Sequence, residues 1–243
     1  MLVLDRGLAP SRERAQALIL AGNILVDDQK VTKAGAMVAS HAALRLLGED
    51  LKYVSRGGLK LERALDHWNI GVAGKVCLDV GASTGGFTDC LLQRGAARVI
   101  AVDTGHGQIA FKLRQDSRVR LIEKNNARYL TREQLGETVD LIAMDVSFIS
   151  ATLVLPAVLS SAFPPAIDEP RGRELIVLVK PQFEAGRENV GKGGIVRDPD
   201  IQQKAVERVR KVVAELGAIS IDVIDSPILG AEGNREFLLL GQF

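Results

Sequence analysis

Cysteine is scarce in this chain, with only Cys77 and Cys90 among 243 residues. The first falls in an expected strand and the second in the helix expected after it, so neither looks like half of a disulfide framework. The three histidines are dispersed and lack ligand spacing with either cysteine, so we expect no metal site. Both cysteines are therefore expected to be free thiols in a reducing cytosol.

Long apolar runs and a strong charge of one sign are also missing. No stretch reaches membrane-spanning length without a proline or a charge, and no basic segment followed by an apolar core opens the sequence. The formal net charge is +1, and the basic surplus within residues 1–60 is modest, so charge alone does not indicate a nucleic-acid binder. We expect a soluble cytoplasmic protein without a membrane span.

Residues 1–47 read as a small α+β module. Ser11 is placed to cap a helix that ends at Gly22, and residues 23–31 read as two short strands around an Asp-Asp turn. Val38 and the alternation at residues 44–46 predict a further strand. Residues 48–58 read as a linker, in which residues 55–58 cap a helix whose first turn contains Lys60.

The remainder, residues 59–243, alternates short apolar runs with helical stretches. Apolar runs without strict alternation predict strands covered on both faces, hence a largely parallel sheet with right-handed βαβ crossovers. The last two runs are too close for an intervening helix and should pair as an antiparallel hairpin. Six parallel strands and one antiparallel seventh are typical of the Rossmann-like fold of class I methyltransferases. The expected strands are Val76–Val80, Arg98–Val102, Val119–Ile122, Leu141–Met144, Leu175–Val179, Ile219–Ile224 and Phe237–Leu240.

Residues 182–199 are expected to lack regular structure. The segment is rich in glycine, carries Lys192 and directly follows Lys180, which favours a lid over the site.

A glycine-rich turn follows the first expected strand of the sheet. Glycines there let backbone N–H groups approach a ligand, which predicts a nucleoside cofactor. Asp103, at the end of the second strand, is placed to accept hydrogen bonds from ribose hydroxyls. Asn126 either borders an adenine or serves as a turn residue. Position 83 is serine where a dinucleotide fingerprint has glycine, which weakens an NAD interpretation. The candidate cofactor-binding residues in the turn are Asp79, Gly81, Ser83, Thr84, Gly85, Gly86, Phe87 and Thr88.

Four polar residues lie near the ends of the expected strands: Lys60, Asp145, Lys180 and Glu236. A ribose 2′-hydroxyl is a weak acid, so its attack on a sulfonium methyl group needs a base and close alignment. Lys180 can be that base only as a neutral amine, which burial, the Lys60 ammonium and a cationic cofactor favour and nearby carboxylates oppose. Each residue alone also fits a structural role, as a surface charge or a turn cap.

Several motifs together resemble the TlyA family of bacterial rRNA ribose 2′-O-methyltransferases, which has an FtsJ-like catalytic domain and is often named haemolysin. The resemblance implies S-adenosylmethionine as the cofactor, ribosomal RNA or ribosomal subunits as the partner, and a catalytic tetrad at Lys60, Asp145, Lys180 and Glu236. It leaves the target nucleotide, the subunit and the oligomeric state open. The motifs are residues 53–61, 79–88, 145–150, 179–184 and 191–194.

The first module is similar to the S4 RNA-binding domain, through residues 8–15 and 21–26. The resemblance implies that Arg12 and Arg14 share one helical surface and meet phosphates, with Lys33 nearby. Arg56 and Lys192 complete the expected RNA-binding set. The chain starts several residues later than S4 domains usually do, so either the start codon is misassigned or the first helix is shortened.

Three other functions compete with rRNA methylation. A membrane-lytic protein would, once purified, lyse red cells even after loss of Lys180, although the sequence shows no strongly basic amphipathic helix. A non-catalytic RNA-binding factor would bind cofactor without transferring methyl. An NAD dehydrogenase would bind NAD in place of S-adenosylmethionine.

Overall fold

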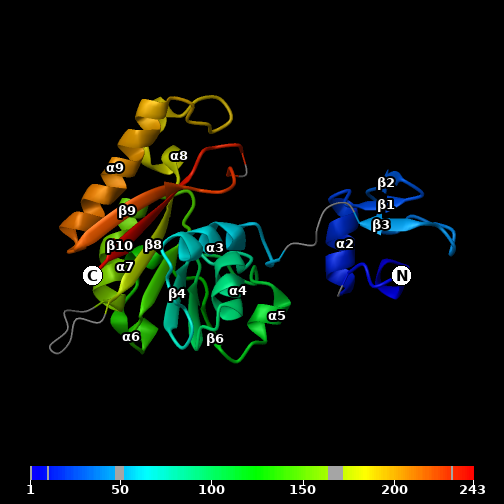
Figure 1. Cartoon of the computed structure of the whole chain (residues 1–243), viewed down its shortest axis with the longest axis horizontal. Coiled ribbons are helices and arrows are strands. Elements are labelled where there is room, and N and C mark those ends of the chain that lie inside the picture. Colours follow the sequence, from blue (N-terminus) through cyan, green and yellow to red (C-terminus); the bar gives the residue numbers. More distant parts are fainter. Residues whose placement is uncertain (1, 10, 47–51, 164–171, 231) are drawn as a thin grey trace. The chain divides into compact units, whose positions relative to one another are not determined.

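The computed structural model describes residues 2–9, 11–46, 52–163, 172–230 and 232–243. The chain divides into two compact units, Met1–Leu51 and Lys52–Phe243 (Figure 1). Each unit has its own hydrophobic core. Residues 52–58, which the sequence analysis assigned to the linker, lie in the second unit. Residues 48–51 fall outside the described part of the chain.

The first unit contains two helices and a three-stranded antiparallel sheet of order β2-β1-β3. The Ser11 hydroxyl accepts a hydrogen bond from the Arg14 amide at 3.2 Å, which confirms the expected cap. Asp27 and Asp28 form the turn with φ of 48° and 63°, and Val38 lies outside the strands. The elements are α1 (Leu2–Asp5), α2 (Arg12–Leu20), β1 (Ile24–Val26), β2 (Gln29–Val31) and β3 (Leu44–Leu46).

The second unit is built on a seven-stranded sheet of order β6-β5-β4-β7-β8-β10-β9, and the expected fold is confirmed. Among the described strands of this sheet, β10 runs opposite to the other six and pairs antiparallel with β8 and β9. The first four strands have the predicted bounds. β4, β5 and β7 are largely buried, which is typical of parallel strands covered on both faces, whereas β6 at the edge is partly exposed. The strands are β4 (Val76–Val80), β5 (Arg98–Val102), β6 (Val119–Ile122), β7 (Leu141–Met144), β8 (Glu174–Val179), β9 (Ser220–Asp225) and β10 (Phe237–Gln242).

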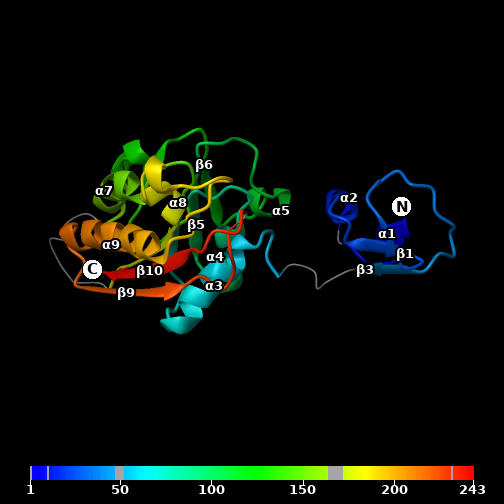
Figure 2. The same ribbon diagram turned by 90° about the horizontal axis from the view of Figure 1, so that it is seen from above.

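Helices cover both faces of this sheet (Figure 2). One core packs α3 (Gly57–His67), α4 (Gly86–Gln93) and α5 (Phe111–Arg114) against the sheet. The other core packs η1 (Ala127–Tyr129), α6 (Arg132–Leu135), α7 (Ala151–Ala162) and α9 (Pro199–Glu215) against the opposite face. Open sheets of this kind bind ligands at the carboxyl ends of their parallel strands.

Two sequence expectations about local structure are wrong. Within the described residues, α3 has no side-chain cap, although residues 55–58 were expected to supply one. The segment after Lys180 is partly helical, forming α8 (Pro181–Glu184) and η2 (Arg187–Asn189), because Pro181 occupies the first helical position, where a missing N–H costs nothing. Asn234, 1% exposed, holds the irregular part that follows, accepting from Val196 N at 3.0 Å and donating to Gly194 O at 2.8 Å.

The segment that enters α3 is bound to the second unit. Tyr53 is 2% exposed, and a Cβ at Gly58 would collide with its ring. The Val54 amide donates to the Asp89 carboxylate at 2.8 Å. These contacts fix the start of α3 and therefore the position of Lys60, three residues into that helix.

Candidate functional site

The glycine-rich turn between β4 and α4 is shaped by protein packing. Gly81 has φ of +87°, and a Cβ there would collide with the backbone carbonyl of Asp145. The amides of Gly81 and Ala82 donate to Val102 O at 2.9 and 3.3 Å, so they are already used. The glycine at position 81 therefore lets the ends of β4 and β7 meet, and its role in ligand approach stays a prediction.

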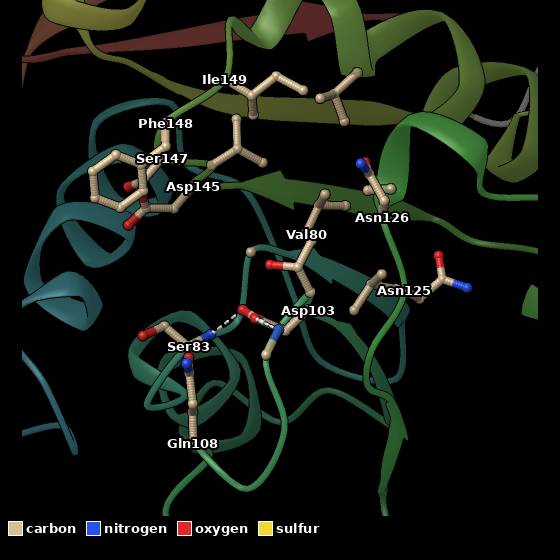
Figure 3. Close-up of a pocket in the computed structure, with 17 residues that line it drawn as sticks. Val80, Ser83, Asp103, Gln108, Asn125, Asn126, Asp145, Ser147, Phe148 and Ile149 are labelled. Carbon is tan, nitrogen blue, oxygen red and sulfur yellow. Dashed lines mark hydrogen bonds between the residues drawn. The ribbon is translucent and has the colours of Figure 1, made fainter.

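A cavity of about 500 Å³ opens beside this turn (Figure 3). The Asp103 carboxylate accepts hydrogen bonds from Ser83 N at 2.8 Å and Gly105 N at 2.6 Å. Each carboxylate oxygen retains a lone pair that can accept a ribose hydroxyl. Ser83, Asp103 and Gln108 lie together in the close-up, with Asp145 farther along the wall.

Asn126 is confirmed as a turn residue, and its place beside an adenine stays a prediction. It lines the cavity beside Asn125, and its side-chain oxygen caps η1 by accepting from Arg128 N at 3.0 Å. The adjoining loop is held by Glu123, which accepts from Gly107 N at 2.8 Å. The hydrogen bond from Arg114 is the main cause that lowers the pKa of Glu123 to about 2, so this anchor stays ionised throughout the neutral range.

All four residues of the expected tetrad line a second cavity of about 290 Å³: Lys60, Asp145, Lys180 and Glu236. They come from α3 and from the ends of β7, β8 and β10. This cavity and the first share Gly81, Ser83 and Asp145 as walls. A cofactor in the first cavity would therefore adjoin the four charged groups of the second.

The four groups form two ion pairs. Lys60 Nζ lies 2.5 Å from Glu236 Oε2, with side chains 10% and 3% exposed. Lys180 Nζ lies 2.6 Å from Asp145 Oδ1, with side chains 11% and 22% exposed, and donates to Ser147 Oγ at 2.7 Å. Each ammonium therefore has a fixed direction within a largely buried site.

The remaining predicted cofactor residues are divided between cavity walls and supports. Thr84, Gly86 and Phe87 line the tetrad cavity, together with Arg56 from the expected RNA-binding set. In the described part of the chain, Asp79, Gly85 and Thr88 line neither cavity. Gly85 has φ of +96°, and a Cβ there would collide with Leu113. We propose that these three residues support the turn rather than contact a ligand.

Asp79 is a buried carboxyl group beneath the turn. It is 0% exposed and accepts from Thr88 Oγ1 at 2.6 Å, while its Oδ1 has no partner among the described residues. Burial raises the pKa of Asp79 to about 7, and the Thr88 hydrogen bond opposes the shift. The folded protein thus holds a proton on Asp79 that the unfolded chain releases near its ordinary pKa of 3.8.

We expect Asp79→Asn to remove a pH dependence of stability. The wild-type contribution is fully present below about pH 3.8 and is lost as pH rises through about 7, because the folded state binds the extra proton. Between pH 5 and 8 the free energy of unfolding of the wild type should therefore fall relative to that of the variant, by on the order of a few kcal/mol. Urea titrations across this range measure the difference, and a difference independent of pH would contradict it.

The residues expected to bind RNA lie in both units. Arg12 and Arg14 are in α2, and Lys33 lines a cavity of the same unit. The expectation that the two arginines share a helical surface is wrong, since residues two positions apart do not face the same side of a helix. In the described chain, Lys192 lines neither the tetrad cavity nor its neighbour.

Ser147 and Phe148 are among the site residues that were not predicted from the sequence. Ser147 binds the Lys180 ammonium. Phe148 is 94% exposed at φ of +64°, a conformation uncommon for a bulky residue, and lines the larger cavity. Both lie in the quoted motif at residues 145–150, but strained backbone and exposure are tertiary properties that the motif does not reveal.

The cysteines are confirmed as free, buried thiols. Burial is the main cause that raises the pKa of Cys77 to about 12 and of Cys90 to about 11, so both are inert at neutral pH. Across the described ranges, none of the helices combines the length and the apolar character needed to cross a membrane.

Comparisons with known proteins agree with this geometry. Residues 53–243 match the FtsJ-like methyltransferase family, and residues 1–43 match the S4 domain. The chain is 46% identical over 238 residues to the 16S/23S rRNA (cytidine-2′-O)-methyltransferase TlyA of Mycobacterium tuberculosis, covering 98% of this chain and 86% of the relative. It is 41% identical over 238 residues to Hemolysin A of Brachyspira hyodysenteriae, covering 97% and 95%.

A solved structure from Streptococcus thermophilus, described as a hemolysin, is also similar. It is 42% identical with a TM-score of 0.74, covering 99% of this chain and 86% of that one. The two family matches together span nearly the whole chain, and the relatives match over nearly all of it. The chain therefore belongs to the TlyA family, with an S4 domain ahead of an FtsJ-like methyltransferase domain.

Proposed function

We propose that this protein transfers a methyl group from S-adenosylmethionine to a cytidine ribose 2′-hydroxyl of ribosomal RNA. The observation that carries the proposal is the shared wall between the cofactor-sized cavity and the cavity lined by the tetrad. The cofactor fits the larger cavity, where Asp103 would hold its ribose and Asn126 would border its adenine. When bound, S-adenosylmethionine supplies an electrophilic methyl group on a sulfonium.

The two ion pairs have separate tasks in this reaction. Lys180 accepts the proton of the 2′-hydroxyl as its oxygen bonds to the methyl carbon and the carbon–sulfur bond breaks. Asp145 and Ser147 fix the position of the Lys180 nitrogen for this transfer. Lys60, held by Glu236, orients the hydroxyl.

The exposed ring of Phe148 supports a nucleotide substrate. It lies 5.5 Å from the ring of Phe183, between centroids, and is three residues from Asp145. Aromatic side chains stack on unpaired bases, and sequence-specific RNA recognition mostly targets bases that are splayed out of a helix. The Phe148 ring is thus available to the base whose ribose enters the tetrad cavity.

The nature of the RNA comes from the relatives. The Mycobacterium tuberculosis relative is named for both 16S and 23S rRNA, and a Campylobacter jejuni relative, 37% identical over 187 residues, for 23S rRNA alone. Cytidine is the methylated nucleoside in both names. The S4 domain supplies RNA affinity outside the catalytic unit.

Labelled methyl transfer tests the function. Purified 30S subunits, 50S subunits and naked rRNA are each incubated with radiolabelled S-adenosylmethionine, and nuclease digestion locates the label. Label on a cytidine 2′-oxygen is expected. Bound cofactor with no labelled RNA would favour a non-catalytic RNA-binding factor.

We expect Arg12→Ala with Arg14→Ala to weaken RNA binding without slowing transfer at saturating RNA. Each lost phosphate contact should reduce the slope of log affinity against log salt by about 1. Filter binding between about 50 and 200 mM salt measures the slope. An unchanged slope would remove both arginines from the RNA surface, and Arg210→Ala in α9, half exposed beside Glu207, is the matched control.

A further inference from the structure

Glu184 is a buried carboxylate close to the site whose role the proposed reaction does not explain. It ends α8, four residues after Lys180, and is 2% exposed. Burial raises its pKa, while hydrogen bonds from Ser150 and Ala151 and the charge of Arg208 oppose the shift. A carboxylate is seldom buried unless its contacts are needed.

Its partners lie on the neighbouring loop, between β7 and α7. The Ser150 hydroxyl donates to Glu184 Oε2, and the Ala151 amide donates to Glu184 Oε1 at 2.6 Å. Ser150 is the N-cap of α7 and Ala151 its first residue. Glu184 therefore caps a helix of another segment, and its own carbonyl accepts from Arg208 of α9 at 2.6 Å.

These hydrogen bonds belong to a row of contacts that joins two segments of the chain. The first segment, residues 145–151, follows β7 and carries Asp145. The second, residues 180–184, follows β8, contains α8 and carries Lys180. Lys180 bonds to Asp145 and Ser147 at the cavity end, the rings of Phe183 and Phe148 meet in the middle, and Glu184 bonds to Ser150 and Ala151 at the buried end. Lys180, Phe183 and Glu184 lie within five consecutive residues. A movement of Glu184 away from Ser150 and Ala151 would therefore also displace Lys180.

We propose that Glu184 is a positioning residue that holds Lys180 in register with Asp145 by clamping the start of α7 to α8. The inference rests on the proposed function, because it acts through Lys180. Alignment of reacting atoms is sensitive: a displacement of about 1 Å can cost about a hundredfold in rate. Loss of the clamp therefore lowers kcat while substrate and cofactor still bind.

The test uses Glu184→Gln in the full-length protein, because glutamine keeps the volume but replaces one acceptor oxygen with a donor. The expected result is a fall in kcat of about tenfold or more, with the KM for RNA and the Kd for S-adenosylmethionine within about twofold of wild type. Ser150→Ala should give a similar loss. The double variant should lose no more than the worse single variant, because both remove one interaction.

Glu174→Gln is the matched control, since Glu174 starts β8, the strand that leads to Lys180, and pairs with Lys75 at 2.7 Å. It should keep kcat even where its Tm falls as far as that of Glu184→Gln. A wild-type kcat in Glu184→Gln, or an equal loss in Glu174→Gln at matched Tm, would overturn the positioning role alone. Absence of wild-type methyl transfer, or full activity in Lys180→Ala, would overturn the proposed function and this inference together.

Discussion

Lys180→Ala should reduce methyl transfer by roughly a hundredfold to ten-thousandfold while cofactor affinity stays near wild type. The lysine nitrogen is the proton acceptor in the proposed step, so its loss affects the transition state more than the bound ground state. It lies in the tetrad cavity, outside the wall of the larger cavity that would hold the cofactor. Single-turnover transfer to labelled RNA and calorimetric titration with S-adenosylmethionine measure the two quantities separately.

Lys180→Arg distinguishes a base from a fixed positive charge. Arginine retains the ion pair with Asp145 but remains protonated, so it can donate and cannot accept. We expect it to be as inactive as alanine. Substantial activity in Lys180→Arg would show that the charge, rather than proton acceptance, is what the reaction needs. Lys75→Ala, which removes a paired lysine near the opposite end of the sheet, should leave turnover unchanged.

The inner strands of the sheet could be predicted closely from sequence because they are buried on both faces. Residues 76–80 and 141–144 contain almost no polar residues, so the apolar run defines where each strand begins and ends. The structure gives both strands the predicted bounds. The short helix after Lys180 was missed because its stability comes from Pro181 and from Glu184 bonding to α7, neither of which alters a hydrophobic pattern.

The contacts within the site could be predicted less well from the sequence, because they join residues that are far apart along the chain. Lys60 and Glu236 are 176 residues apart, and no periodicity connects them; their positions near strand ends and the family resemblance suggested that they belong together. Gly81 was assigned to ligand approach, and its close contact with the Asp145 carbonyl could not be foreseen, because that contact exists only once β4 and β7 are paired. Phe148 looked apolar and was given no role, yet its backbone conformation keeps the ring in solvent.

Substitutions in the buried pair of Lys60 and Glu236 should separate its effect on stability from its effect on activity. Lys60→Met leaves the Glu236 carboxylate, 3% exposed, without its partner. Breaking one side of a buried ion pair costs about 3–5 kcal/mol, which for a unit of this size lowers the Tm by roughly 10 °C. Thermal unfolding of the variant measures that loss directly.

Adding Glu236→Leu to Lys60→Met should recover most of the lost stability. A hydrophobic pair of similar volume removes the uncompensated charge, and such replacements are often neutral or stabilising. Activity should not return with it, because neither side chain can then orient a hydroxyl. A stable double variant that still methylates RNA would show that this pair serves only the fold, leaving Asp145 and Lys180 as the reactive part of the tetrad.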